Sequence, residues 1–180
     1  MNNYLFEEHS HNFGVWTAAR AVSRNFTSTL YIKNAIDCSG LKEFVASNKV
    51  VDQECFNNLH KVWANRIIAS LNVAHAKGVS YGRAAKVIAI YLKTTVVLVQ
   101  RGDSEKSRVI HPPVDRILLR ALLKKFPHFT YLKNVNWTQL DEGSYWVLAD
   151  KIKVDLKGFN WQLEYYWKPE SEIAYQSKHF

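Results

Sequence analysis

The chain has 180 residues and a formal net charge of +8 at pH 7; 47% of its residues are hydrophobic and 22% are charged. This length favours one domain with its own core, and seven glycines and four prolines are too few for a disordered chain. No apolar run approaches the roughly 18 residues that span a bilayer, and the N-terminus has no signal-peptide pattern. Two cysteines, Cys38 and Cys55, build neither a disulfide framework nor a metal site. We therefore expect a cytoplasmic protein without membrane association, metal or cofactor.

Helical periodicity predicts the elements of the first half. Apolar residues recur with helical spacing through Phe13, Trp16 and Val22, with Ser10 or Asn12 as the N-cap. A second, short helix begins after a cap at Thr27-Ser28 and stops at Gly40. The longest helix begins at Asp52 and keeps its apolar spacing until Gly78.

The second half continues the helical pattern. Ser80 caps a helix from Tyr81 to about Val99; the β-branched residues of its end also suit a strand, but its apolar face continues. Residues 101–110 form a polar loop, and the next helix begins at Pro112-Pro113 with Asp115 in its first turn and ends at Pro127. Another helix opens at Thr138 and Asp141 and ends at Gly158, and the aromatic segment 159–167 suits a last helix. The prediction is a mainly α, single compact domain over residues 1–180, with six or seven helices and a helix-hairpin-helix-like turn near 78–86.

The positive charge is concentrated in the middle of the chain. Residues 1–60 have a net charge of −1, residues 61–133 of +11 and residues 134–180 of −2. A polyanion is the natural partner of such a field, because each neutralised phosphate releases condensed counterions. We therefore expect a nucleic-acid partner, with DNA as the leading candidate. The alternatives are docking to an acidic protein and a charge that only maintains solubility.

Residues 78–88 join two predicted helices through a turn between Gly78 and Gly82. The N–H groups at the start of a helix attract phosphate, because they carry the positive end of the helix dipole. Arg83, Lys86 and Lys93 then follow on roughly one face of the helix. The alternative is an ordinary helix–turn–helix corner whose polar face meets water.

Residues 108–116 place one carboxylate among cations. Asp115 is the only acidic residue between Glu105 and Asp141, and Arg108 and Arg116 flank it. An acid at the start of a helix is stabilised by the helix dipole, which alone accounts for its presence. The sharper interpretation is a catalytic carboxylate in a basic groove. The residues that we expect to bind nucleic acid are Gly78, Gly82, Arg83, Lys93, Arg108, His111, Arg116 and Arg120.

The two segments together resemble the helix–hairpin–helix DNA glycosylases, in which a Gly-hydrophobic-Gly hairpin precedes a helix with a lysine and a Val-Asp pair opens a later helix. Gly78-Val79, Gly82, Lys86 and Pro113-Val114-Asp115 stand here in similar order, with a longer hairpin. The resemblance implies a bifunctional glycosylase/lyase that flips a base out of the stack. It also implies that Lys86 attacks the sugar to form a Schiff base, while Asp115 deprotonates the lysine and stabilises positive charge on the sugar.

The whole chain is also similar to an uncharacterised helical family of bacterial and mobile-element proteins. The matching segments are HNFGVWTAARA at 11–21, AAKVIAIYLK at 84–93 and IHPPVD at 110–115. This resemblance implies a helical fold and no particular activity. A regulatory or defence module without enzymatic activity, which docks an acidic protein partner, is therefore the alternative function.

Trp16 and Arg20 stand four residues apart on the first helix. Such a pair stacks a base or grips a phosphate, or else the tryptophan belongs to the core and the arginine pairs locally. The seven histidines lack metal-ligand spacing, and no P-loop, Rossmann glycine pattern or nucleophile elbow is present.

Overall fold

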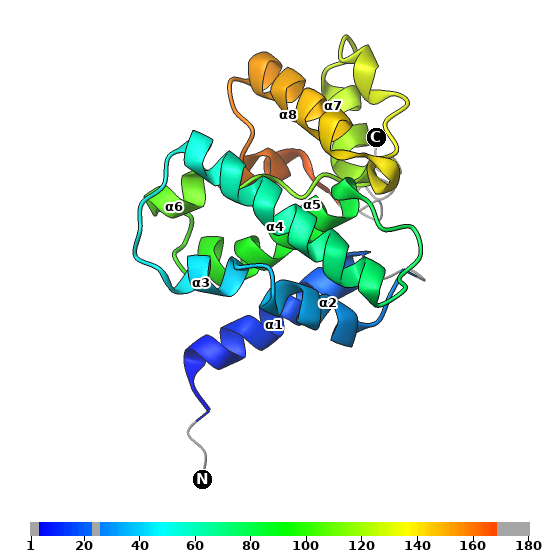
Figure 1. Cartoon of the computed structure of the whole chain (residues 1–180). Helices are drawn as coiled ribbons and strands as arrows, with labels where there is room; N and C mark the ends of the chain where they lie inside the picture. The colour runs from blue at the N-terminus through cyan, green and yellow to red at the C-terminus, as the bar shows by residue number, and fades with distance from the viewer. Residues whose placement is uncertain (1–3, 23–25, 169–180) are drawn as a thin grey trace, which may run out of the picture.

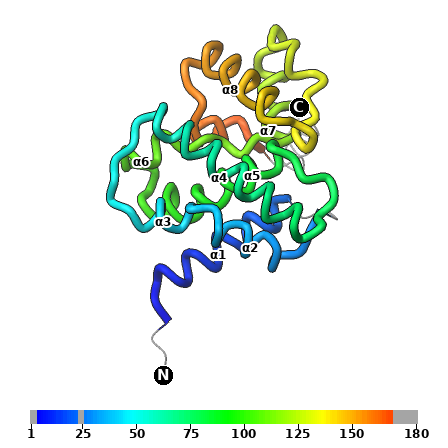
Figure 2. The backbone as a smooth tube through the Cα atoms, in the orientation of Figure 1, coloured from blue at the N-terminus to red at the C-terminus, as the bar shows by residue number. Residues whose placement is uncertain are grey.

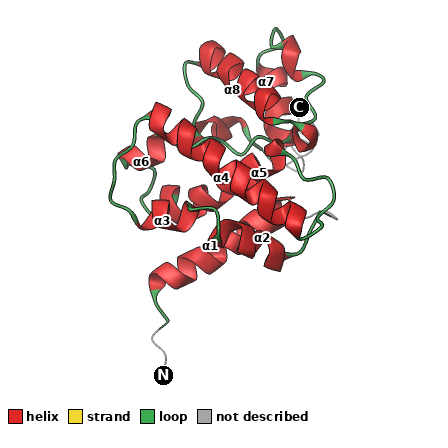
Figure 3. Ribbon diagram, in the orientation of Figure 1, coloured by secondary structure: helices red, strands yellow, loops and turns green. Residues whose placement is uncertain are grey.

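The computed structural model of the chain describes residues 4–22 and 26–168, which form helices joined by loops (Figure 1). No strand occurs in these two ranges (Figure 3), so the prediction of a mainly α fold is confirmed. The longer helices are α1 (Phe6–Val22), α2 (Thr29–Asp37), α4 (Gln53–Val73), α5 (Tyr81–Leu92), α7 (Arg116–Lys125) and α8 (Glu142–Leu156). The short elements are α3 (Leu41–Ala46), the π-helical turn η1 (Lys93–Val97), α6 (Glu105–Arg108) and the 3₁₀ turns η2 (Thr130–Leu132), η3 (Trp137–Gln139) and η4 (Trp161–Tyr166).

Four of the helices begin at N-caps that the sequence predicts. In each case a side-chain oxygen accepts a hydrogen bond from the backbone N–H three residues later, which satisfies a group that the helix itself leaves unpaired. The four caps are Ser28 on α2, Asp52 on α4, Ser80 on α5 and Asp141 on α8.

Helix α5 is the centre of the core. Ten of its twelve residues are buried, Tyr91 and Leu92 almost completely. Helices α1 and α4 both pack against it, and α2 packs against both of those. The tube in Figure 2 places α1 and α2 at one end of the molecule and α7 and α8 at the other. A helix buried on nearly all sides explains why the sequence of α5 is apolar over most of its circumference.

Small residues on α1 allow it to approach α5 closely. A Cβ atom at Gly14 would lie 2.7 Å from Cγ2 of Thr95 and 3.0 Å from the Tyr91 ring. The buried face of α1 is therefore not the one with the large apolar side chains. Of the three residues whose spacing predicts one apolar stripe, Val22 is buried, whereas Phe13 and Trp16 are 49% and 51% exposed. The expected cap at Ser10 or Asn12 is also wrong, because α1 already begins at Phe6.

Gly40, at which the second helix is predicted to stop, lies between α2 and a further short helix. Gly40 has a φ of 100°, a left-handed conformation that glycine adopts without steric cost, and it is the N-cap of the unpredicted α3. The loop expected at 101–110 contains α6, which Ser104 caps. Helix α4 ends at Val73, before the expected stop at Gly78, and the last expected helix is the 3₁₀ turn η4.

Candidate functional site

Lys86 and Asp115 meet in the interior of the fold. The Lys86 Nζ atom lies 3.0 Å from Oδ2 of Asp115, although the two residues are 29 positions apart in sequence. Lys86 comes from the second turn of α5, and Asp115 stands at the start of α7. Both residues are 8% exposed. The structure therefore brings together the two residues that the sequence analysis selected for catalysis.

Asp115 is held in place by three donors. Its Oδ1 atom accepts the backbone N–H of Leu118 at 2.9 Å, so that Asp115 is the N-cap of α7 and not a first-turn residue. Its Oδ2 atom accepts both the Lys86 ammonium and the indole N–H of Trp167, the latter at 3.2 Å. The buried segment 112–114 delivers the carboxylate to this position. A carboxylate with all these partners has a fixed orientation toward the lysine.

Trp137 lies against the lysine. The Lys86 Nζ atom is 4.5 Å from the centre of the Trp137 ring, a cation–π distance. Gly82 makes this approach possible, since a Cβ atom there would stand 1.9 Å from the Trp137 carbonyl oxygen. The Gly82 N–H also donates to the carbonyl oxygen of Leu140 at 3.0 Å. The segment around η3 is thereby fixed to the start of α5.

Residues 161–167, which we call the covering segment, are tied down beside the pair. Glu164 forms a 2.8 Å ion pair with Lys93, which follows Lys86 by two helical turns. Trp167 donates to Asp115. Lys86 and Lys93 therefore each have a carboxylate partner from a later part of the chain. Any access to Lys86 from the side of Trp167 requires this segment to move.

The phosphate site expected at the start of α5 is not open. The N–H of Gly82 is bonded to Leu140, and the N–H of Arg83 is bonded to the Ser80 cap at 3.2 Å. Arg83 is half-buried, with its guanidinium 4.2 Å from the centre of the Phe26 ring, and burial lowers its pKa. These groups match the alternative of an ordinary helix–turn–helix corner. Gly78 is exposed in the preceding turn, with a φ of 71°.

His111 lies in the core, which corrects its place among the expected nucleic-acid ligands. It is 3% exposed, its Nδ1 atom is 3.1 Å from the Tyr145 hydroxyl, and its Nε2 atom is 3.0 Å from Oδ1 of Asn57. Its ring centre is 5.0 Å from that of the fully buried His60, which pairs with the Tyr81 hydroxyl. Burial lowers the pKa of His60 to about 3 and lowers that of His111 well below its ordinary value. Both are neutral core residues at physiological pH.

Three of the expected nucleic-acid ligands are exposed cations. Arg108 belongs to α6, whereas Arg116 and Arg120 belong to α7 and stand one turn apart. Lys124, exposed one turn further along, extends these two residues into a row on the outer side of α7. The described residues thus contribute two different features: an enclosed lysine–aspartate pair and a row of cations at the surface of the helix that Asp115 caps.

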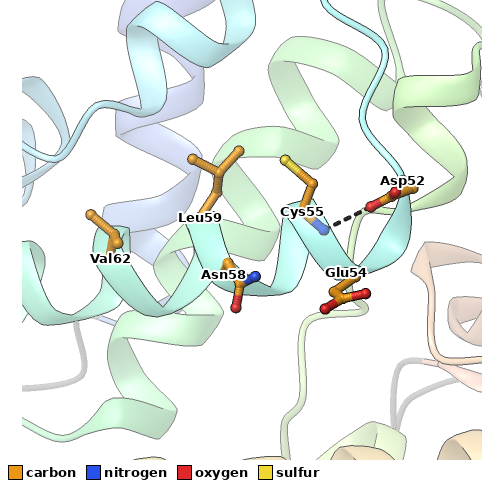
Figure 4. A pocket seen from close by; sticks show the side chains of 6 residues that line it. All are labelled: Asp52, Glu54, Cys55, Asn58, Leu59 and Val62. Carbon is orange, nitrogen blue, oxygen red and sulfur yellow. Dashed lines mark hydrogen bonds between the residues drawn. The ribbon is translucent and has the colours of Figure 1, made fainter.

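A hollow of about 440 Å³ lies on the outer side of α4 (Figure 4). Its lining residues include no cation, and Cys55 and Leu59 project from the same face of the helix there. It is therefore separate in chemistry from the predicted basic groove. Cys38 and Cys55 are both exposed free thiols, and residues 4–22 and 26–168 contain no cluster of three potential metal ligands.

Sequence reasoning missed Trp137, Glu164 and Trp167 as neighbours of the predicted site. These residues reach Lys86, Lys93 and Asp115 only through tertiary structure, and no local motif marks them. None of the described helices combines the length and apolar character that crossing a bilayer requires. No family model, curated protein or solved structure matches the chain. The two resemblances therefore stay predictions.

Proposed function

We propose that the chain binds DNA and acts on it by base excision, with Lys86 as nucleophile and Asp115 as its proton acceptor. The observation that carries this proposal is the 3.0 Å contact between the two side chains, which come from separate helices. A lysine nucleophile needs a nearby base, because only the neutral amine attacks carbon. The backbone N–H of Leu118 holds Asp115 at hydrogen-bond distance from Lys86, which meets that geometric requirement.

The proposed reaction conserves atoms and charge. Asp115 takes one proton from the Lys86 ammonium, and the free amine forms a bond to C1′ of the deoxyribose. The C1′–N glycosidic bond breaks, and the departing base keeps that electron pair and receives the proton from Asp115. A second proton moves from the lysine nitrogen to O4′ as the C1′–O4′ bond breaks. The product is a protonated Schiff base between Lys86 and an open-chain sugar.

A nucleotide reaches Lys86 only after the covering segment has moved, since the lysine is 8% exposed. Opening breaks the Trp167–Asp115 hydrogen bond and the Lys93–Glu164 ion pair. The indole of Trp137 lies beside the lysine, and aromatic rings stack nucleobases with little sequence preference. The cations on the outer side of α7 would contact the phosphate backbone.

Reduction with borohydride in the presence of abasic and damaged-base oligonucleotides tests the proposal, because it traps a Schiff base as a stable adduct. The informative variant is Lys86→Arg, which keeps a cation beside Asp115 but has no nucleophilic amine. Lys93→Arg is the matched control, since Lys93 is also paired with a carboxylate. We expect adducts with the wild type and Lys93→Arg and none with Lys86→Arg. Equal trapping by all three proteins, or by none, refutes the proposed chemistry.

A second function, docking of an acidic protein without catalysis, is favoured by the row of Arg116, Arg120 and Lys124. Such a row attracts any polyanion and does not need the enclosed pair. Measuring oligonucleotide affinity between 50 and 200 mM salt separates the two functions. DNA binding through several phosphates falls steeply with salt, on the order of 10-fold or more over this range. If no oligonucleotide binds at low salt, an acidic protein becomes the better partner.

A further inference from the structure

One face of α1 has large aromatic side chains that nothing in the described fold covers. Phe6, Phe13 and Trp16 are 63%, 49% and 51% exposed. Helical spacing places all three on the side opposite the buried residues of α1. Tyr4 folds back onto this side, because its hydroxyl accepts from the Asn12 amide at 3.3 Å. We call the surface of Tyr4, Leu5, Phe6, Phe13 and Trp16 the α1 face.

The α1 face is ordered and projects from the body of the molecule. The Phe13 and Trp16 rings are stacked, with centres 5.8 Å apart and an angle of 19° between their planes. In Figure 1 the N-terminal half of α1 extends beyond the other helices, so a partner has free access to it. A contiguous exposed patch of aromatic side chains is typical of an interaction site, because aromatic residues dominate the energetics of interfaces.

The apolar area of the α1 face matches what a dimer interface needs. A large apolar or aromatic side chain has about 200 Å² of surface, so five of them at somewhat more than half exposure offer roughly 500 Å². A standard interface buries about 800 Å² on each partner, of which roughly 450 Å² is apolar. The α1 face alone therefore supplies the apolar share of one side of such an interface.

The charges of α1 favour an apolar protein surface over a polyanion as the partner of the α1 face. Glu7 and Glu8 lie in the first turn of α1, and Arg20 lies in its last turn. Helical spacing places Arg20 on the α1 face, whereas the two glutamates lie on the other side of the helix. One arginine against two glutamates gives α1 no net attraction for phosphate. A second copy instead brings an apolar surface of the same size and chemistry.

We propose that the chain forms a two-fold symmetric dimer in which the α1 faces of two copies pack against each other. The arrangement is self-complementary, as an isologous interface must be, since one surface supplies both sides. It buries Phe13 and Trp16 near the symmetry axis. This inference is independent of the proposed base excision, which concerns Lys86.

Sedimentation equilibrium of the full chain over a range of concentrations tests the proposal. We expect the wild type to approach twice the chain mass of 20.9 kDa at micromolar to high micromolar concentration. Phe13→Glu places two carboxylates at the symmetry axis and should weaken dimerisation by about 100-fold or more. Val154→Glu is the control, because Val154 is 77% exposed on α8, so this variant should dimerise like the wild type. Circular dichroism establishes that both variants are folded.

A second variant tests the same face through its other ring. Trp16→Glu should also weaken dimerisation by about 100-fold, because the Trp16 ring stacks on Phe13 within the α1 face. A wild type that remains at 20.9 kDa, or a Phe13→Glu variant that dimerises normally, overturns the dimer through this face.

Discussion

Acid should destabilise this protein through its two buried histidines, His60 and His111. Burial lowers the pKa of His60 to about 3, against an ordinary value of 6.5 that applies in the unfolded chain. Below pH 6.5 the His60 side chain therefore binds a proton in the unfolded state but stays neutral in the folded state. The contribution of His60 to the free energy of unfolding is fully present above pH 6.5 and is lost as the pH falls toward 3. Between pH 7 and pH 5 His60 should cost about 2 kcal/mol of unfolding free energy, and His111 acts in the same direction.

The assay is urea unfolding followed by tryptophan fluorescence at several pH values from 7 to 5. Around pH 5.5, His60→Gln should lower the slope of unfolding free energy against pH by roughly 1.2 kcal/mol per unit, because one titrating group is removed. Glutamine also keeps a polar partner for the Tyr81 hydroxyl, which His60 contacts at 3.1 Å. His128→Gln is the control, since that exposed imidazole loses little hydration on folding. Equal slopes for the wild type and His60→Gln would refute the reasoning.

Three substitutions probe the candidate site and the helices by urea or thermal unfolding. Asp115→Ala should lower the free energy of unfolding by about 4 kcal/mol, because it leaves the Lys86 ammonium buried without its partner and removes the cap of α7. A loss below about 1 kcal/mol would contradict the described pairing. Gly82→Ala should cost about 2 kcal/mol or more, because its Cβ would collide with the Trp137 carbonyl oxygen, 1.9 Å away. Gly143→Ala should instead raise the free energy of unfolding by about 0.5 to 1 kcal/mol, since its Cβ meets no atom closer than 3.7 Å. If the two alanine variants change the free energy of unfolding by the same amount, the described packing at Gly82 is wrong.

Helix positions followed from the sequence where a local interaction decides them. The side chains of Asp52, Ser80 and Asp141 cap helices because each accepts a nearby backbone N–H, and three residues suffice to recognise that pattern. The buried face of α1 could not be predicted from the sequence in this way. Phe6, Phe13 and Trp16 are the largest apolar residues of that helix and are all exposed, yet Gly14 faces the core, because only a small residue lets α1 approach Tyr91. Size, not hydrophobicity, selects that face.

The candidate site was predictable only in part for a related reason. Lys86 and Asp115 each stand in a segment with a recognisable pattern, so both were found, and the fold brings them into contact. His111 was misplaced because a histidine beside cations has the same sequence pattern whether it faces solvent or packs against Tyr145. Glu164 comes from a segment with no motif at all. Its contact with Lys93 spans 71 residues, and only the folded chain specifies it.

The covering segment also sets an order in which the protein can assemble. Lys86 and Asp115 both leave the ribosome before Glu164 and Trp167 have been synthesised. If the lysine–aspartate pair forms during translation, its outer side is therefore still exposed to water. The last contacts made, Trp167 with Asp115 and Glu164 with Lys93, close over a pair that is already in place. A molecule in which the pair forms early thus passes once through the open arrangement that the proposed chemistry requires of the mature protein.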